Sequence, residues 1–304
     1  MAEAVAYDEI ALIQETAGDA GVSAQDIPAV RRVFVETGGG QRVSALLWGE
    51  APEVAFLHGG GQNAHTWDTL MMYLRRPAIA VDLPGHGHSD WRADRDYMAW
   101  TAAEAVAAVL SQVAPDVAGV VGMSLGGLTT IRLAATRPDL VRRAVVVDVT
   151  PSVQAAQLGM TRAHRGTTAL VGGPPSYPTF DAMFEATAAA ASPHRDRVSL
   201  RRGVLHNARQ LPDGTWAWRY DRLTPADGAQ RDFAPLWDDL ARSAAPFTLV
   251  RGGNSRFVRD EDAAHFVSVK PGTTVQVVDG AAHSVQSDAP EALARLVEQF
   301  VFGG

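Results

Sequence analysis

A serine stands between two glycines at the point where an apolar, strand-like run gives way to a helix-like segment. Residues 122–126 read Gly-Met-Ser-Leu-Gly, with Ser124 at the centre. This G-x-S-x-G spacing is typical of a nucleophile on a sharp strand-to-helix turn, where side chains at the two flanking positions would collide with neighbouring backbone. The start of the following helix offers free N–H groups to developing negative charge. The spacing therefore predicts that Ser124 is a nucleophile.

Three glycines follow another apolar run, in the segment His58-Gly59-Gly60-Gly61. Glycine lets the backbone approach a ligand closely and point N–H groups into a pocket. We expect Gly60, with Gly61 as second choice, to donate one N–H to an oxyanion. Leu125 should donate the other, because it follows the nucleophile. A phosphate-binding loop is disfavoured, because no Lys-Ser/Thr pair follows the glycines.

One of the nine histidines has a distinctive position. His283 follows the last strand-like run, in a loop of small residues that could carry it over Ser124. Its expected role is general base toward the serine and then general acid toward the leaving group. His58 is the main rival, although we expect it to hold the glycine loop. His86 and His88 lie in a turn-rich loop and are interpreted as structural or rim residues.

These motifs resemble those of the α/β-hydrolase fold superfamily, and in particular its cap-bearing serine esterases and C–C hydrolases. The resemblance covers about residues 30–150 and 245–303 and implies a mostly parallel sheet with helices on both faces. It also implies a helical cap inserted after the sixth strand. Four blocks carry it in family order: His58-Gly59-Gly60 with Trp67, Asp82-Leu83-Pro84-Gly85-His86-Gly87-His88-Ser89, Gly122-Met123-Ser124-Leu125-Gly126-Gly127 and Gly280-Ala281-Ala282-His283.

The acid of the expected triad departs from the commonest family pattern. In that pattern the acid follows the seventh strand, three residues after a glycine. The matching residue here is Ser255, which cannot orient an imidazole as a carboxylate does. Asp260 and Asp262 follow shortly afterwards. They are more simply interpreted as the first turn of a helix, where acidic residues complement the helix dipole.

The favoured acid is Asp148, at the end of the run that precedes the insert. It lies 24 residues after Ser124, a spacing that some family members, such as the haloalkane dehalogenases, use for their acid. A carboxylate at the carboxyl end of a parallel strand faces the same crevice as the nucleophile. Asp148 would then fix the tautomer of His283 and stabilise its cation. Asp260 and Asp262 stay open as alternatives.

The order of apolar runs and helix-period segments predicts an α/β fold. Short continuous apolar runs indicate parallel strands that are buried on both faces, and helical segments alternate with them. The expected strands cover residues 31–37, 42–50, 54–57, 78–83, 119–123, 144–149, 247–252 and 274–280, and the expected helices cover 65–76, 98–114, 125–138, 260–269 and 290–301.

This alternation also sets the expected domains. Residues 28–150 and 241–304 form the α/β-hydrolase core, and residues 1–27 form an N-terminal extension without chemistry of its own. Residues 151–240 lack a strong buried strand and are too long for a loop, so they are predicted to form a helical cap. Within the cap, Met160, Trp216 and Trp218 are candidate substrate contacts, together with Met123 beside the nucleophile. The aromatic side chains could equally form the cap's own core.

Composition excludes several other classes. The chain of 304 residues has no cysteine, which excludes disulfides, a thiolate nucleophile and cysteine zinc sites. Its formal net charge is −7, and no basic block suggests nucleic-acid binding. No apolar run is long enough for a membrane span, and the N-terminus lacks the features of a signal peptide. We therefore expect a cytoplasmic protein that acts on a small molecule without a metal or cofactor. A homodimer that uses the N-terminal extension is one option.

Taken together, the motifs predict a serine hydrolase. Its expected substrate is a small, fairly apolar carboxylic ester or lactone, cleaved through an acyl-enzyme on a Ser-His-Asp triad. C–C bond hydrolysis of a meta-cleavage product would use the same triad. A ligand-binding or signalling protein with slow turnover is the alternative from a different class, and turnover would discriminate it. Haloalkane dehalogenase and epoxide hydrolase chemistry are disfavoured, because family members with those activities use an aspartate nucleophile where this chain has Ser124.

Overall fold

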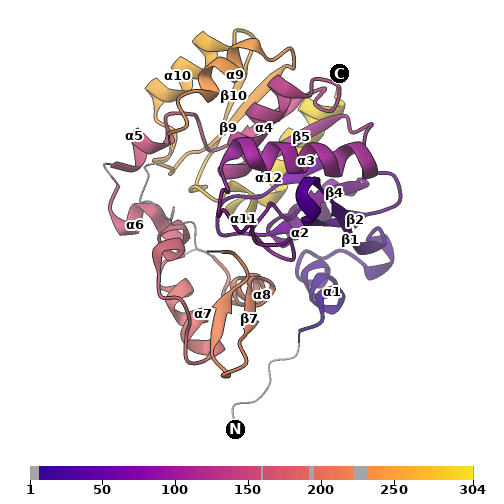
Figure 1. Ribbon diagram of the computed structural model, residues 1–304, viewed down its shortest axis with the longest axis vertical. Coiled ribbons are helices and arrows are strands. Elements are labelled where there is room, and N and C mark those ends of the chain that lie inside the picture. The colour runs from indigo at the N-terminus through magenta and orange to yellow at the C-terminus, as the bar shows by residue number, and fades with distance from the viewer. Residues whose placement is uncertain (1–6, 159, 192–194, 222–231, 304) are drawn as a thin grey trace.

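The computed structural model describes residues 7–158, 160–191, 195–221 and 232–303 of the chain. One large sheet runs through the molecule, with helices packed on both of its faces (Figure 1). A second group of elements, from the insert in the sequence, gathers at one end of this core.

The large sheet has eight strands in the order β1-β2-β4-β3-β5-β6-β9-β10. β2 pairs antiparallel with both β1 and β4, and all the other pairs are parallel. All eight predicted strands are confirmed, to within a few residues at their ends. Their bounds are β1 (Val30–Glu36), β2 (Arg42–Trp48), β3 (Val54–Leu57), β4 (Ala78–Val81), β5 (Gly119–Met123), β6 (Ala144–Val147), β9 (Phe247–Gly252) and β10 (Thr274–Val278).

Helices cover both faces of this sheet, because successive residues of each buried strand point to opposite sides. In β4, for example, Ile79 and Val81 belong to one apolar cluster, whereas Ala78 and Ala80 belong to the other. The first cluster includes residues of α3 (Ala99–Val113), α4 (Leu125–Thr136), α9 (Leu236–Arg242) and α10 (Asp260–Val269). The second includes residues of α1 (Glu9–Asp19), α2 (Asp68–Leu74), α11 (Val285–Asp288) and α12 (Pro290–Val297).

The insert, which is called the cap below, has an apolar core of its own. Phe180, Phe184, Trp216 and Trp218 are among the side chains buried there. In Figure 1 most of these elements lie at the opposite end of the molecule from α9 and α10. They are α5 (Val153–Leu158), α6 (Arg162–Arg165), η4 (Gly166–Gly172), α7 (Phe180–Ala188), α8 (Arg197–Asn207) and the antiparallel hairpin of β7 (Ala208–Gln210) and β8 (Trp216–Trp218).

Three features differ from what the sequence suggested or add to it. The predicted cap boundary at residue 240 falls inside α9, which packs on α4, with Leu236 and Leu240 fully buried in the core. The β7–β8 hairpin was not predicted, because each strand has only three residues. The N-terminal extension packs as α1, which buries Ile13 and Ala17 against the core. Within the described residues, no helix is both long enough and apolar enough to cross a membrane.

Candidate active site

Ser124 occupies a strained turn between β5 and α4. Its backbone has φ 50° and ψ −117°, a conformation that side-chain-bearing residues rarely adopt. The flanking glycines permit this turn through close backbone contacts. A Cβ atom on Gly122 would lie 2.2 Å from the carbonyl oxygen of Gly126, and one on Gly126 would lie 2.2 Å from the carbonyl oxygen of Leu57. The G-x-S-x-G spacing therefore has the steric origin expected from the sequence.

Two buried histidines, His58 and His86, hold the glycine loop after β3. The backbone N–H of Leu83 donates to Nε2 of His58 at 2.9 Å, so Nδ1 of His58 carries the proton and donates to the carbonyl of Gly59 at 2.8 Å. The N–H of Gly61 donates to Nε2 of His86 at 3.1 Å. Burial lowers the pKa of His58, which favours the neutral ring that this pattern requires. His58 and His86 therefore hold the loop.

His283 and Asp148 meet at the carboxyl edge of the sheet. Asp148 directly follows β6, and its Oδ2 lies 2.8 Å from Nδ1 of His283. Both side chains are buried, and Nε2 of His283 is a buried atom without a hydrogen-bond partner among the described residues. Ser124 is attached to the same edge, because its N–H donates to the carbonyl of Val147 at 3.1 Å. The sequence-predicted serine and aspartate therefore follow the neighbouring parallel strands β5 and β6, and the histidine lies in the loop after β10, which β9 separates from β6.

Further contacts hold the carboxylate and the imidazole in place. The N–H of Gly252 donates to Oδ1 of Asp148 at 3.0 Å, and the Ser255 hydroxyl donates to its Oδ2. The ring of Phe257 stacks on His283, with centroids 3.6 Å apart and planes at 14°. Ser255, at the position that matches the commonest family acid, therefore supplies a hydrogen-bond donor to Asp148. The sequence showed that Ser255 was not an acid, but it gave no sign of this hydrogen bond.

The two rival acids have other partners. Asp260 is largely exposed and pairs with Arg251 at 2.6 Å. Asp262 accepts the backbone N–H of Arg259 at 3.1 Å and caps the start of α10. Both lie in the first turn of that helix, as expected from the sequence.

The predicted oxyanion donors differ in their hydrogen bonding. The N–H of Gly61 is directed to His86, whereas the N–H of Gly60 makes no hydrogen bond within the described part of the chain. Leu125 opens α4, where the first N–H groups of a helix have no helical acceptor. The loop is also close to the nucleophile, because a Cβ on Gly59 would lie 3.3 Å from Cβ of Ser124. This geometry favours Gly60 over Gly61.

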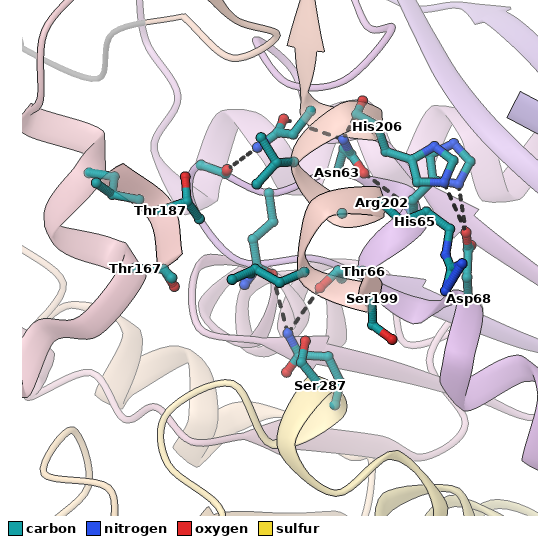
Figure 2. A pocket seen from close by; sticks show the side chains of 18 of the residues that line it. Asn63, His65, Thr66, Asp68, Thr167, Thr187, Ser199, Arg202, His206 and Ser287 are labelled. Atoms are coloured by element: carbon teal, nitrogen blue, oxygen red, sulfur yellow. Dashed lines mark hydrogen bonds and ion pairs between the residues drawn. The ribbon is translucent and has the colours of Figure 1, made fainter. Parts of the chain in front are cut away.

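A cavity of about 200 Å³ lies between the core and the cap. Gly60, Gly61 and Gln286 line its core side, and Figure 2 shows Thr187 and Ser199 reaching it from the cap. Of the predicted substrate contacts, only Trp218 lines it. Trp216 packs on Phe180 inside the cap, Met160 borders a separate surface hollow, and Met123 is buried beneath the glycine loop.

Comparison with known proteins identifies the family. Residues 54–296 match the alpha/beta hydrolase family. The chain belongs to this family. Esterase Rv0045c of Mycobacterium tuberculosis is 52% identical over 303 residues, which cover 97% of this chain and 96% of that protein. A solved structure of that esterase superposes with a TM-score of 0.84 at 51% identity and covers 97% of this chain and 98% of the other. The 2-(acetamidomethylene)succinate hydrolase of Mesorhizobium japonicum is 30% identical over 260 residues, 83% of this chain and 89% of that protein.

This α/β hydrolase also contains a buried charge cluster that sequence reasoning missed. Nδ1 of His65 lies 2.8 Å from Asp68, its Nε2 lies 3.4 Å from Glu9, and its ring stacks on His206 of the cap with centroids 3.6 Å apart. Arg32 pairs with Glu9 at 2.8 Å. Only the His65–Asp68 spacing is visible in the sequence, because the other partners are distant along the chain.

The cluster is better suited to hydrogen-bonded ions than to a metal. Nitrogen and oxygen atoms of His65, Asp68 and His206 lie within 4.8 Å of one another, a spacing that could suit an ion. However, the two rings are inclined by only 15° and stacked, so one ion could not lie in the plane of both (Figure 2). Burial opposes charge on His65, but Asp68 and Glu9 raise its pKa to about 9. Burial and the neighbouring His65 lower the pKa of His206 to about 2.

Proposed function

We propose that this protein is a serine esterase that cleaves a small carboxylic ester through an acyl-enzyme on Ser124. The observation that carries the proposal is the buried imidazole of His283, with Nδ1 bonded to Asp148 and Nε2 unpartnered. An imidazole held in this tautomer can accept a proton at Nε2. The 52% identity to an esterase supports the choice of an ester substrate.

In the proposed reaction, Nε2 of His283 accepts the hydroxyl proton as Oγ of Ser124 attacks the ester carbonyl. The tetrahedral oxyanion is stabilised by the N–H groups of Gly60 and Leu125. When the intermediate collapses, the C–O bond to the alcohol breaks and His283 gives its proton to the departing oxygen. Water then attacks the acyl-enzyme by the same route and releases the acid. Asp148 stabilises the histidine cation in both halves and does not itself take the proton.

The proposed substrate is small, because the cavity next to Gly60 is below the ~300–1,000 Å³ typical of pockets for drug-sized ligands. Leu170, Val171 and Trp218 line part of it and would pack against an apolar portion of the ester. A lactone of similar size would use the same steps. Cytoplasmic location, independence of metals and cofactors, and a homodimer stay predictions from the sequence.

Replacement of the nucleophile tests this proposal. Ser124→Ala should abolish hydrolysis of p-nitrophenyl butyrate and labelling by a fluorophosphonate, while the circular-dichroism spectrum and Tm stay close to those of the parent. Ser152→Ala is the matched control, because its hydroxyl lies outside the proposed machinery, and it should retain both properties. Near-parental turnover by a folded Ser124→Ala variant would exclude the acyl-enzyme.

A further inference from the structure

The cavity between core and cap has a wall rich in hydroxyl groups. Threonine or serine side chains reach it from η3 (Ala64–Trp67), η4, α7, α8 and α11. Those labelled in Figure 2 are Thr66, Thr167, Thr187, Ser199 and Ser287. Hydroxyls both donate and accept hydrogen bonds. A cavity meant only for an alkyl chain has no need of them, since polar groups facing an apolar ligand lose their hydrogen bonds to water.

Several of these hydroxyls have hydrogen-bonding capacity to spare. Within the described residues, the O–H groups of Thr167 and Ser287 donate to no protein acceptor, and Thr66 serves only as an acceptor, from Nε2 of Gln286 at 3.1 Å. The Ser199 hydroxyl bonds to the Asp196 carboxylate, which leaves the Ser199 oxygen free to accept a hydrogen bond. The same Gln286 is fully buried, and its Oε1 has no partner there. The wall therefore combines free hydroxyls with a buried amide oxygen that has no partner among the described residues.

The charged side chains of the lining are already neutralised. Arg195 pairs with Asp288 at 3.0 Å, and Arg202 pairs with Glu15 and Asp19 of α1. Asp68 is paired with His65. An anionic or cationic ligand would have to break one of these pairs, whereas an uncharged polar ligand would not.

The cavity also lies against the glycine loop, although Ser124 and His283 are not among the residues that line it. Gly60, the favoured oxyanion donor, lines it, and Gln286 lies in α11, which begins two residues after His283. A group bonded to the reacting carbonyl could therefore extend from the oxyanion loop into the hydroxyl-rich wall.

We propose that the cavity is a subsite for an uncharged, hydroxylated arm of the ester, of the size of a glycerol or single sugar unit. This proposal rests on the esterase function proposed above. The arm would lie against Trp218 and exchange hydrogen bonds with Thr167 and Ser199, which come from two different cap elements. The hydroxylated arm is either the alcohol or the acyl part of the ester, and both parts offer the same chemistry to the wall.

Matched ester pairs test the subsite with the full-length protein. The glycerol monoester of butyric acid is compared with propyl butyrate for the alcohol arm, and the propyl ester of dihydroxybutyric acid is compared with propyl butyrate for the acyl arm. One hydroxylated ester should have the higher kcat/KM. The preference is the kcat/KM of the hydroxylated ester divided by that of propyl butyrate. Thr167→Val and Ser199→Ala should each lower this preference about 2- to 10-fold, because one hydrogen bond contributes about 0.5–1.5 kcal/mol. Thr274→Val, at an exposed position, is the control and should not change this preference.

The outcomes separate the subsite from the esterase function. If the parent protein prefers neither hydroxylated ester but hydrolyses propyl butyrate through Ser124, the subsite is wrong and the esterase proposal stands. A preference that survives both Thr167→Val and Ser199→Ala also overturns the subsite. Failure to hydrolyse any of the three esters, with no labelling of Ser124, would instead overturn the proposed function.

Discussion

The sharpest prediction concerns the acid, because the sequence left three aspartates open. Replacing Asp148 with asparagine keeps the shape of a fully buried side chain but changes what it offers to His283. The carboxylate now accepts hydrogen bonds from Gly252, Ser255 and His283. An asparagine oxygen can still accept a hydrogen bond from the Gly252 N–H. In that orientation the amide NH₂ faces Ser255 and His283.

This reversal determines the size of the effect. Facing an NH₂ group, Nδ1 of His283 must act as an acceptor, so the proton moves to Nε2. The imidazole can then no longer take the proton of Ser124 at Nε2. Loss of a triad acid in this way costs about 10⁴ in kcat, or about 5 kcal/mol of transition-state stabilisation. The fold should survive, because Ser255 can reverse its hydroxyl and accept from the new NH₂.

The assay is steady-state hydrolysis of p-nitrophenyl butyrate, with thermal melts to confirm folding. Asp148→Asn should show the large fall in kcat with a KM within a few-fold of the parent. Asp260→Asn and Asp262→Asn are the matched controls and should retain most of the activity, because both side chains pair within or beside α10. If one of them lost about 10⁴ in kcat while Asp148→Asn stayed active, the assignment of Asp148 would be refuted.

Three further outcomes are expected. Gln286→Ala should lower kcat more than it changes KM, because its amide joins the helix after the catalytic loop to Gln62, which holds the glycine loop. If a variant with the same Tm but a substitution away from the glycine loop lost as much kcat, this role would be contradicted. Ile13→Ala should lower the unfolding free energy by about 2–5 kcal/mol in urea titrations, because Ile13 is buried. The exposed Leu158→Ala should lower it by less than about 0.5 kcal/mol. The raised pKa of His65 stabilises the fold fully below about pH 6.5, and this contribution, about 3 kcal/mol, is lost as pH rises through about 9. His65→Gln should remove that alkaline loss, and an unchanged pH profile would contradict the assignment.

Much of the core could be predicted from the sequence, because its information is local. Continuous apolar runs marked all eight strands, and the glycine spacing around Ser124 marked the turn that the structure contains. Parallel strands place their carboxyl ends at one edge, so residues that follow β5 and β6 had to lie near each other. This reasoning also placed Asp148 beside His283, although the commonest family position for the acid lies on the next strand.

The lining of the cavity and the buried charge cluster could not be predicted, because their determinants are long-range. Trp216 and Trp218 belong to the same short strand and both lie in the cap's apolar core, but only Trp218 also lines the cavity. His206 stacks on His65 across about half the chain, and no local spacing records such a contact. The N-terminal extension also supplies Glu9, whose carboxylate lies 3.4 Å from Nε2 of the buried His65, a long-range contact that the sequence did not indicate.

Ser124 and Asp148, the proposed nucleophile and acid, share a backbone conformation with positive φ. Ser124 and Asp148 each directly follow a parallel strand, and both have positive φ, at 50° and 51°. Each is held there by a hydrogen bond to the next strand, from Ser124 N–H to Val147 and from Asp148 N–H to Val250. A strained residue persists only where its surroundings over-determine its conformation, and here the sheet itself supplies that constraint. The backbones that carry both side chains are thus fixed by the most buried part of the core.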